Sequence, residues 1–289
     1  TATSMGGRLL RRWINDPLLD IEEIKLRHHA VQELCDNVML RGELNESLKK
    51  VYDIERLAGK ISYGNANARD LISLKNSLES LPSIKSLLEK ANSSLIQNLY
   101  KNVDELQDIY ELINEAIVED PPIAIKEGGI IKPGFSKEID EYKSASINAK
   151  QWIINLEAKE KELTGIKNLK VGYTKVFGYY IEVTNSFLKS VPLDRYIRKQ
   201  TLTGCERFIT EELKSMEDKI LGSQEKAIIL EYNTFIAIRN EIAKNIERLQ
   251  KTANSLANLD VLNSFAQVAE ENNYVKPTMN NSGVINIKE

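Results

Sequence analysis

A heptad seam between residues 139 and 163 is the feature that most constrains the fold. Steps of three and four residues alternate along it without a break, through Ile139, Tyr142, Ser146, Ala149, Ile153, Leu156, Glu160 and Leu163. Ser136 is placed to cap this helix and Thr164-Gly165 to end it. At about 1.5 Å per residue, roughly 27 helical residues make a rod of about 40 Å. Such a one-sided seam is typical of a helix that packs along a second long helix.

A second long helix is predicted after Thr210. Glu211 and Glu212 begin it, and acidic side chains in a first turn interact favourably with the helix dipole. Gly222 lowers helix propensity by about 1 kcal/mol relative to alanine and marks a point where the helix can bend. The apolar seam comprises Leu213, Met216, Ile220, Ala227, Leu230, Thr234 and Ala237. Two matching seams predict an antiparallel pair of long helices.

Between the two helices lies the only basic stretch with clear strand character. Residues 169–184 alternate in polarity like a β-hairpin, and residues 195–203 follow as a second basic segment. Gly172 and Gly178 lie in or beside the predicted strands, which indicates a bulge or close approach of another group to the backbone. The chain is therefore expected to run out along one helix, form a small antiparallel sheet and return along the other.

The rest of the sequence is mostly helical in pattern. Residues 6–118 contain apolar stripes at helical spacing joined by short turns, with Ser4 expected to cap the first helix and Asp20 the second. Two short exceptions are a hairpin around Glu127-Gly-Gly129 and a strand over Val284–Ile287. The predicted fold class is mainly α, with a long antiparallel helix pair that carries a small antiparallel β unit at its tip.

Charge is distributed unevenly along the chain. The net charge is −3, but residues 151–210 carry ten basic and six acidic side chains, so this stretch is positive and the remainder is negative. Cations and short hydroxyl donors of this kind contact the phosphates of nucleic acids. The candidate contact residues are Lys170, Lys175, Arg195, Arg198, Lys199, Thr201 and Thr203. No helix face suited to base reading accompanies them, so duplex backbone contact without sequence preference is the functional interpretation.

Two other interpretations stay open from the residues alone. A basic edge also keeps a small sheet soluble without binding anything. Alternatively, the helix pair is a structural coiled-coil arm whose tip docks a protein partner, or an arm that binds RNA.

Catalytic and metal-binding motifs are missing from the sequence. No G-x-x-x-x-G-K-[ST] loop, C-x-x-C or H-E-x-x-H occurs, so enzymatic activity is not expected. Cys35 and Cys205 are far apart, and the adjacent His28 and His29 point in different directions on a helix, which disfavours a metal site. No apolar run approaches the roughly 20 residues that span a bilayer. The chain does not begin with Met and enters a helical pattern at once, so we expect it to be part of a longer protein.

Five segments carry a resemblance to a known family. They read MGGRLLRRWI followed by PLLD, DIERLAGKI with ARDL, LKVGY with FGYYIEV, YIRKQTL, and ERFITEELK. In this order they resemble the MutS family of DNA mismatch-repair proteins. Two departures from the family pattern are Ala68, where proline is usual, and Gly204, where asparagine is frequent. At Gly204 a side-chain donor is lost, so a backbone N–H or Thr203 would have to replace it.

The resemblance implies a domain organisation and a set of partners. A helical lever domain would comprise residues 1–150 and 211–289, with a β-rich clamp domain inserted at 151–210. In the family, the levers of a homodimer reach over double-stranded DNA and the clamps touch its backbone. The resemblance also implies a MutL-type partner and a place in the bacterial cytoplasm with the nucleoid. Mismatch reading and the ATPase with its ATP and Mg²⁺ would lie outside this chain, which would have no cofactor of its own.

Overall fold

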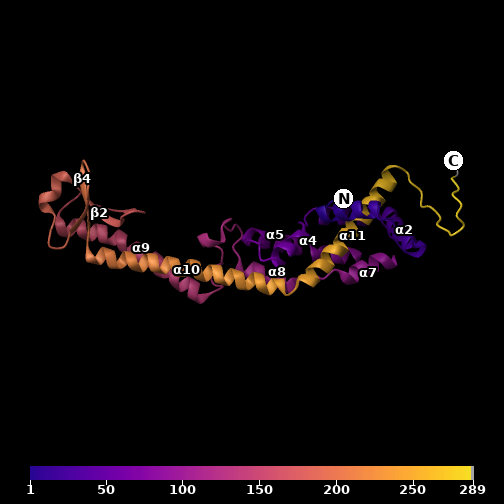
Figure 1. The fold of residues 1–289 in the computed structure, drawn as a ribbon, viewed down its shortest axis with the longest axis horizontal. Coiled ribbons are helices and arrows are strands. Elements are labelled where there is room, and N and C mark those ends of the chain that lie inside the picture. The colour runs from indigo at the N-terminus through magenta and orange to yellow at the C-terminus, as the bar shows by residue number, and fades with distance from the viewer. Residues whose placement is uncertain (288–289) are drawn as a thin grey trace. The chain divides into compact units, whose positions relative to one another are not determined.

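The computed structural model describes residues 1–287 and is mainly helical, with one four-stranded antiparallel sheet (Figure 1). Two compact units are present: one contains Thr1–Ile125 and the chain from Phe235 onward, and the other contains Lys126–Thr234. We call them unit 1 and unit 2. The domain boundaries expected at residues 150 and 210 concern the lever and clamp domains rather than these compact units, and they stay a prediction.

Most helices belong to unit 1. The helices before the first unit boundary are α1 (Ser4–Asn15), α2 (Ile21–Asp36), α3 (Val38–Leu48), α4 (Ile54–Ser62), α5 (Ala68–Leu78), α6 (Leu81–Leu88), α7 (Ser94–Asn102) and α8 (Gln107–Ala116). The long helix α11 (Ile246–Glu271) packs against α1, α2, α3, α4 and α7. Since its buried residues include leucines and alanines on several faces, α11 forms the centre of this unit's core.

The first helix begins one residue earlier than predicted. Thr3, rather than Ser4, is the N-cap of α1, and its hydroxyl accepts a hydrogen bond from the Gly6 N–H. Buried Asp260 of α11 fixes Thr3 by accepting from its backbone N–H and its hydroxyl, at 2.7 and 2.6 Å. A Cβ on Gly6 would lie 2.1 Å from an Asp260 oxygen, so this close packing requires glycine. The Asp20 cap of α2 is confirmed.

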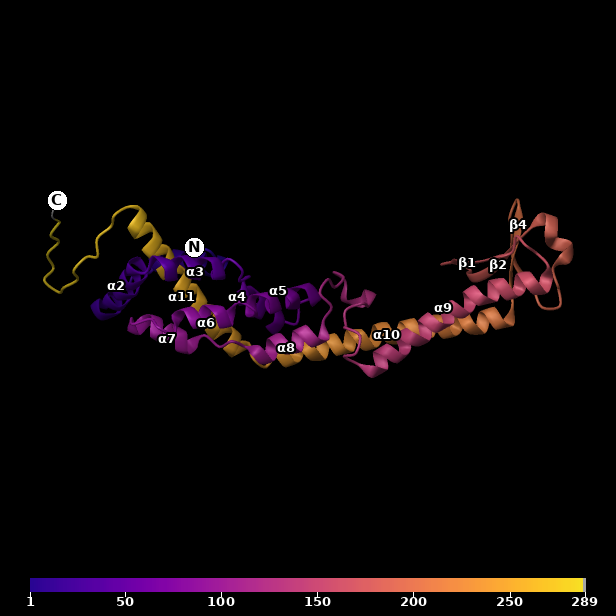
Figure 2. The same ribbon diagram turned by 180° about the vertical axis from the view of Figure 1, so that it is seen from behind.

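The two long helices of the prediction are confirmed. They are α9 (Lys137–Thr164) and α10 (Glu211–Ala243), which lie side by side in both views (Figure 1, Figure 2). Ser136 caps α9, and Gly165 ends it in the left-handed conformation. The seam of α9 is buried through Glu160 except for half-buried Tyr142, whereas Leu163 in the last turn is exposed. Helix α10 continues through Gly222 without a break.

The predicted hairpin around residue 128 is wrong. Residues Ile125–Glu127 form a single 3-10 turn, η1, and Gly128 and Gly129 have positive φ angles of 76° and 73°. The physical reason is that Ile130 N–H donates to the buried carboxylate of Glu231 on α10, at 2.8 Å, rather than to a neighbouring strand. Lys143 of α9 forms an ion pair with the same carboxylate. The loop is therefore held on the helix pair by Glu231.

The small sheet lies between α9 and α10 in the chain and has the strand order β1-β2-β4-β3. The strands are β1 (Lys170–Thr174), β2 (Gly178–Thr184), β3 (Ile197–Thr201) and β4 (Cys205–Ile209), with a 3-10 segment, η2 (Asn185–Ser190), after β2. One face buries Ile181, Val183 and Phe208 against residues of α9 and α10. This arrangement confirms the predicted antiparallel sheet at the end of the first long helix.

Close approach to the backbone explains both strand glycines. A Cβ on Gly172 would lie 2.7 Å from the Tyr180 ring on the neighbouring strand. Gly178 has a φ of 73°, and a Cβ there would meet the carboxylate of Glu217. The bulge lies elsewhere, between Arg198 and Gln200.

The chain after α11 does not form the predicted strand. Val284–Ile287 are exposed and have no strand partner among the described residues. Their apolar alternation alone does not make a strand, because strands need neighbours to satisfy their backbone groups. The end of this predicted segment, at 288–289, lies outside the described residues.

Candidate nucleic-acid interface

Two of the seven candidate residues lie in turns at opposite ends of the sheet. Lys175 lies in the β1–β2 turn, and Thr203 lies in the β3–β4 turn. Thr174 pairs with Gly178 at one end of β2, whereas Thr184 pairs with Cys205 at its other end. Seven residues of strand span about 20 Å at 3.3 Å per residue. The two turns are therefore separate candidate contact points.

The end of β3 and the turn that follows it contain three of the candidates, and we refer to residues 199–204 together as the β3–β4 turn. Lys199 and Thr201 are exposed on β3, and Thr203 is exposed in the turn itself. Leu202 N–H closes the turn on the Cys205 carbonyl at 2.9 Å. Because the turn is hydrogen-bonded internally, its exposed side chains are presented from a fixed backbone.

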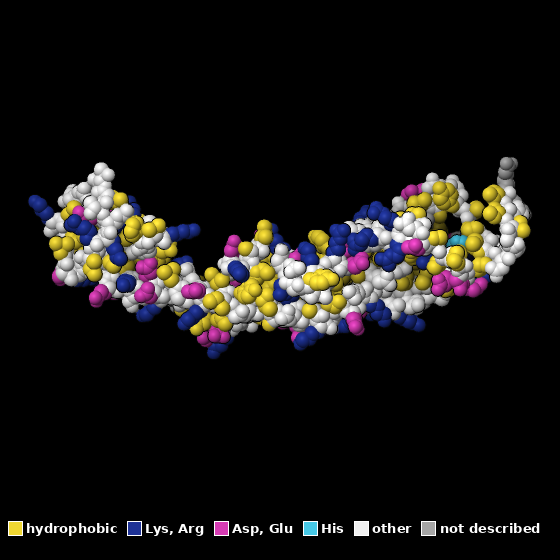
Figure 3. Space-filling view, in the orientation of Figure 1, with side chains coloured by type: hydrophobic (Ala, Val, Ile, Leu, Met, Phe, Trp, Pro, Cys, Tyr) yellow, Lys and Arg dark blue, Asp and Glu magenta, His cyan; other side chains and the backbone are white. Residues whose placement is uncertain are grey.

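Lys199 lies in a β-bulge. Arg198 pairs with Phe208 and Gln200 with Arg207, so Lys199 has no partner residue on β4. Bulges of this kind bend the strand and redirect a side chain. Within residues 1–287 the Lys199 ammonium makes no ion pair, and the same is true of Lys175. Figure 3 shows isolated lysine and arginine side chains projecting from the part of unit 2 that contains the sheet.

Arg195 has an internal partner. Its guanidinium donates to the carboxylate of Glu160, which is 1% exposed on α9, at 2.7 Å. The Tyr196 hydroxyl donates to the other oxygen of Glu160 at 2.6 Å. Burial, together with this hydrogen bond, raises the pKa of Tyr196. The three side chains anchor the start of β3 to α9.

Arg198 also lies against a buried carboxylate. Its Nε is 2.8 Å from an oxygen of Glu206, whose side chain is 8% exposed, whereas that of Arg198 is 56% exposed. The contact lacks hydrogen-bond geometry, and the Glu206 oxygen has no hydrogen-bond partner. Glu206 faces the core because it lies two residues before Phe208, on the same face of β4, and is paired with Val183.

Arg207 stabilises the opposite face of the sheet. It donates to Glu182 on β2 and to Gln200 on β3, each at 3.0 Å, and its guanidinium stacks 4.1 Å from the Tyr180 ring. Lys170 lies directly opposite Glu182 in the β1–β2 register. The contacts of Arg207 join β4 to β2 and β3, so Arg207 acts as a structural cation.

Two polar residues near the β3–β4 turn were not predicted. Asn185 N–H donates to the Gly204 carbonyl at 3.1 Å, and its amide donates to the Thr203 carbonyl at 3.2 Å. Ser186 follows and is exposed. The sequence signal for these two residues was the run of short polar side chains at the end of β2. Their position beside the β3–β4 turn depends on the pairing of β2 with β4, which the sequence pattern does not specify.

Other kinds of site find no support within residues 1–287. No group of three or more His, Cys, Asp or Glu side chains could hold a metal ion there. Both cysteines are free thiols, and burial raises the pKa of each. None of the described helices is long and apolar enough to cross a membrane.

Comparisons with known proteins agree with the residue patterns. The family model for MutS domain III matches residues 1–266. The DNA mismatch repair protein MutS of Alkaliphilus oremlandii (strain OhILAs) is 55% identical over the whole chain, and that of Clostridium tetani (strain Massachusetts / E88) is 54% identical. The corresponding protein of Acetivibrio thermocellus is 53% identical. The chain spans about a third of the length of these relatives, 33% in each case. It belongs to the MutS family, and it contains the family's domain III.

Proposed function

We propose that this domain III contacts the backbone of duplex DNA, without sequence preference, through the β3–β4 turn. The observation that carries the proposal is Lys199, which a bulge leaves without a paired residue on β4 and which has no internal anion among the described residues. Thr201 and Thr203 supply exposed hydroxyls beside it. Lys170 and Lys175 are second contacts at more distant points of the same sheet.

The local charge supports a polyanionic ligand. Residues 165–209 contain eight basic and three acidic residues, although the whole chain has a net charge of −3. A lysine with neighbouring hydroxyls can bind phosphate oxygens, but it lacks the paired donors and acceptors that distinguish bases. Contact of this kind gives affinity that falls steeply with salt and does not depend on sequence.

Helix α10 is the feature that supports mechanical coupling. It begins two residues after β4 ends at Ile209 and continues to Ala243 without interruption. We infer that a displacement of the sheet on DNA is passed along this helix. In this proposal, mismatch reading and the binding and hydrolysis of ATP with Mg²⁺ belong to parts of MutS proteins outside this chain. A second copy and a MutL-type protein are the proposed protein partners, in the bacterial cytoplasm with the nucleoid.

The test uses a complete MutS protein that carries this domain III. Lys199→Glu should weaken binding to matched and mismatched duplexes by the same factor, about tenfold near 100 mM salt, because it removes one phosphate contact and adds a repulsive charge. Lys150→Glu is the matched control, since Lys150 is an exposed lysine on α9 about 20 Å from the end of that helix. Equal effects of the two variants, or a loss confined to mismatched DNA, would contradict the proposal.

A second function has one specific observation in its favour. Val176 and Phe177, at the β1–β2 turn, are exposed apolar residues, with Val176 81% exposed. Such a tip would suit docking of a protein partner. If the arm docks a MutL-type protein there, Val176→Ser with Phe177→Ser should abolish that complex and leave DNA affinity unchanged. If the complex survives, docking at this turn is excluded.

A further inference from the structure

The contact that motivates the inference is the ion pair between exposed Arg198 and buried Glu206. We propose that Glu206 withholds Arg198 from DNA and thereby limits the affinity of the β3–β4 turn. The inference rests on the proposed function, because it concerns how strongly the same turn holds a phosphate backbone. It reverses the sequence-based prediction that Arg198 itself contacts DNA.

Glu206 has few ways to be neutralised. Its side chain is 8% exposed and lies on the core face of β4, in register with buried Val183. Arg198 is the only cation that forms an ion pair with it among residues 1–287. Its Oε2 has no hydrogen-bond partner besides. The negative charge of the Glu206 carboxylate is therefore compensated only by Arg198 among the described residues.

This dependence sets the cost of releasing the arginine. A buried charge that loses its partner is strongly destabilised, since the surrounding protein solvates it poorly. If Arg198 turned to a DNA phosphate, Glu206 would be left in that state. Part of the interaction energy with the phosphate would be used to separate the pair. Arg198 therefore stays on Glu206, and unpaired Lys199 makes the contact.

A neighbouring pair shows what a different arrangement looks like. Arg207 is held by Glu182, but it also donates to Gln200 and stacks on Tyr180. Loss of the Glu182 charge would leave Arg207 in place through these two contacts. Arg198 has no comparable second hold in the described structure. The two carboxylates thus form a matched set: neutralising either adds the same charge, but only one change frees an arginine.

The consequence for function is a lower affinity of the β3–β4 turn for the DNA backbone. A contact that does not read sequence binds any duplex, so each added cation would lengthen residence on every stretch of DNA. By keeping one exposed arginine occupied, Glu206 keeps the turn to a single unpaired cation, Lys199. The carboxylate acts as a positioning residue for Arg198 and does not touch DNA.

The experiment compares Glu206→Gln with Glu182→Gln in a complete MutS protein that carries this domain III. Glu206→Gln should raise affinity for a matched duplex about fivefold near 100 mM salt and steepen the salt dependence by about 0.9, which corresponds to one more phosphate contact. Glu182→Gln should leave the slope unchanged. Glu206→Gln combined with Arg198→Gln should return affinity to the parent level.

Three results would overturn the inference. One is an equal gain from both glutamine variants, which would reflect net charge alone. Another is no gain from Glu206→Gln when Lys199→Glu still weakens binding, which would leave the proposed function intact. The third uses Arg198→Gln alone and covers the case in which Glu206→Gln unfolds the sheet: a salt slope lower by about 0.9 would show that Arg198 already contacts phosphate. Failure of Lys199→Glu to weaken binding would instead reject the proposed function.

Discussion

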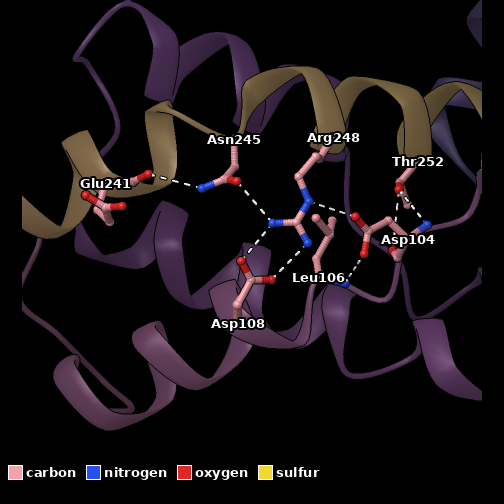
Figure 4. Close-up of polar contacts among 7 residues, drawn as sticks. All are labelled: Asp104, Leu106, Asp108, Glu241, Asn245, Arg248 and Thr252. Carbon is pink, nitrogen blue, oxygen red and sulfur yellow. Dashed lines mark hydrogen bonds and ion pairs between the residues drawn. The ribbon is translucent and has the colours of Figure 1, made fainter.

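The start of α11 in unit 1 carries the half-buried cation Arg248 and the β3–β4 turn in unit 2 carries the exposed cation Lys199, and the two differ in what surrounds the charge. Arg248 donates to Asp104 at 2.7 Å and to both oxygens of Asp108, and it also donates to Asn245 (Figure 4). Nearly all of its donors are occupied. Lys199 at the β3–β4 turn has no such partner within the described residues.

We infer that internal partners, rather than charge, distinguish a structural cation from one that is available to a ligand. Arg248 joins α11 to the segment around α8, and Thr252 extends the junction by accepting from the Asp104 N–H at 3.1 Å. Its charge is used within the protein. In and beside the sheet, Arg195 and Arg207 resemble Arg248, whereas the charges of Lys175 and Lys199 face solvent or a ligand. Variants of the paired cations should therefore lose stability, and variants of the unpaired ones should lose binding.

The largest expected effect is on Arg195. Arg195→Ala should lower the free energy of unfolding by about 3 kcal/mol, because buried Glu160 loses its cation. The Tyr196 hydroxyl still donates to Glu160, which keeps the loss near the low end for such pairs. Urea denaturation measures it. A loss below about 0.5 kcal/mol, the range of ordinary surface changes, would show that Glu160 is not dependent on Arg195.

Arg248→Ala should have a smaller effect of the same kind. Its partners Asp104 and Asp108 are partly exposed, so water can replace much of the lost interaction. We expect a loss of about 1 kcal/mol in unfolding free energy. DNA affinity should not change directly, since nearly all the donors of Arg248 are already occupied by groups of the protein. A variant as stable as the parent would show that the partners of Arg248 do not stabilise the protein, which would contradict the distinction between paired and unpaired cations.

The contribution of Arg248 should also depend on pH. Its hydrogen bonds lower the pKa of both Asp104 and Asp108. A carboxyl whose folded pKa is depressed stabilises the protein above its unfolded pKa, about 3.9 for aspartate, and that stabilisation is lost as pH falls through the folded value. The difference in stability between the parent and Arg248→Ala should be full at neutral pH and shrink under acid conditions. Denaturation curves that kept a constant difference down to pH of about 2 would contradict this coupling.

The smallest effect is expected at the other turn of the sheet. Lys175 is unpaired, but it lies at the end of β2 opposite the β3–β4 turn and lacks neighbouring threonines other than Thr174. Lys175→Gln should lower duplex affinity by less than about twofold in low salt, with no loss of stability. A loss larger than that of Lys199→Gln would move the principal contact to the β1–β2 turn.

The elements could be predicted because their patterns are local. The seam from Ile139 to Glu160 and the alternation around Gly172 each repeat over many residues, so packing and pattern agree. The loop at Gly128 could not be predicted, because its conformation depends on a hydrogen bond to Glu231, about a hundred residues away. The strand at Val284 was predicted from alternation without a partner strand.

The candidate site was harder to predict because ion pairs join distant residues. Composition selected Arg195, Arg198 and Lys199 equally, and only the fold separates them. Part of the signal was present. Glu160 occupies a seam position and Glu206 alternates with buried Phe208, so each carboxylate falls on an apolar face. A buried carboxylate requires a cation, and such positions predict that a nearby arginine is internally engaged.

The salt dependence of duplex binding by a complete MutS protein with Lys199→Gln in this domain III tests the central claim most directly. The logarithm of affinity should fall less steeply with the logarithm of salt, by about 0.9, equally for matched and mismatched duplexes. Lys150→Gln, with the same charge change on α9, should leave the slope unchanged. A Lys199→Gln protein with the parent's slope would contradict the claim that the β3–β4 turn contacts the DNA backbone.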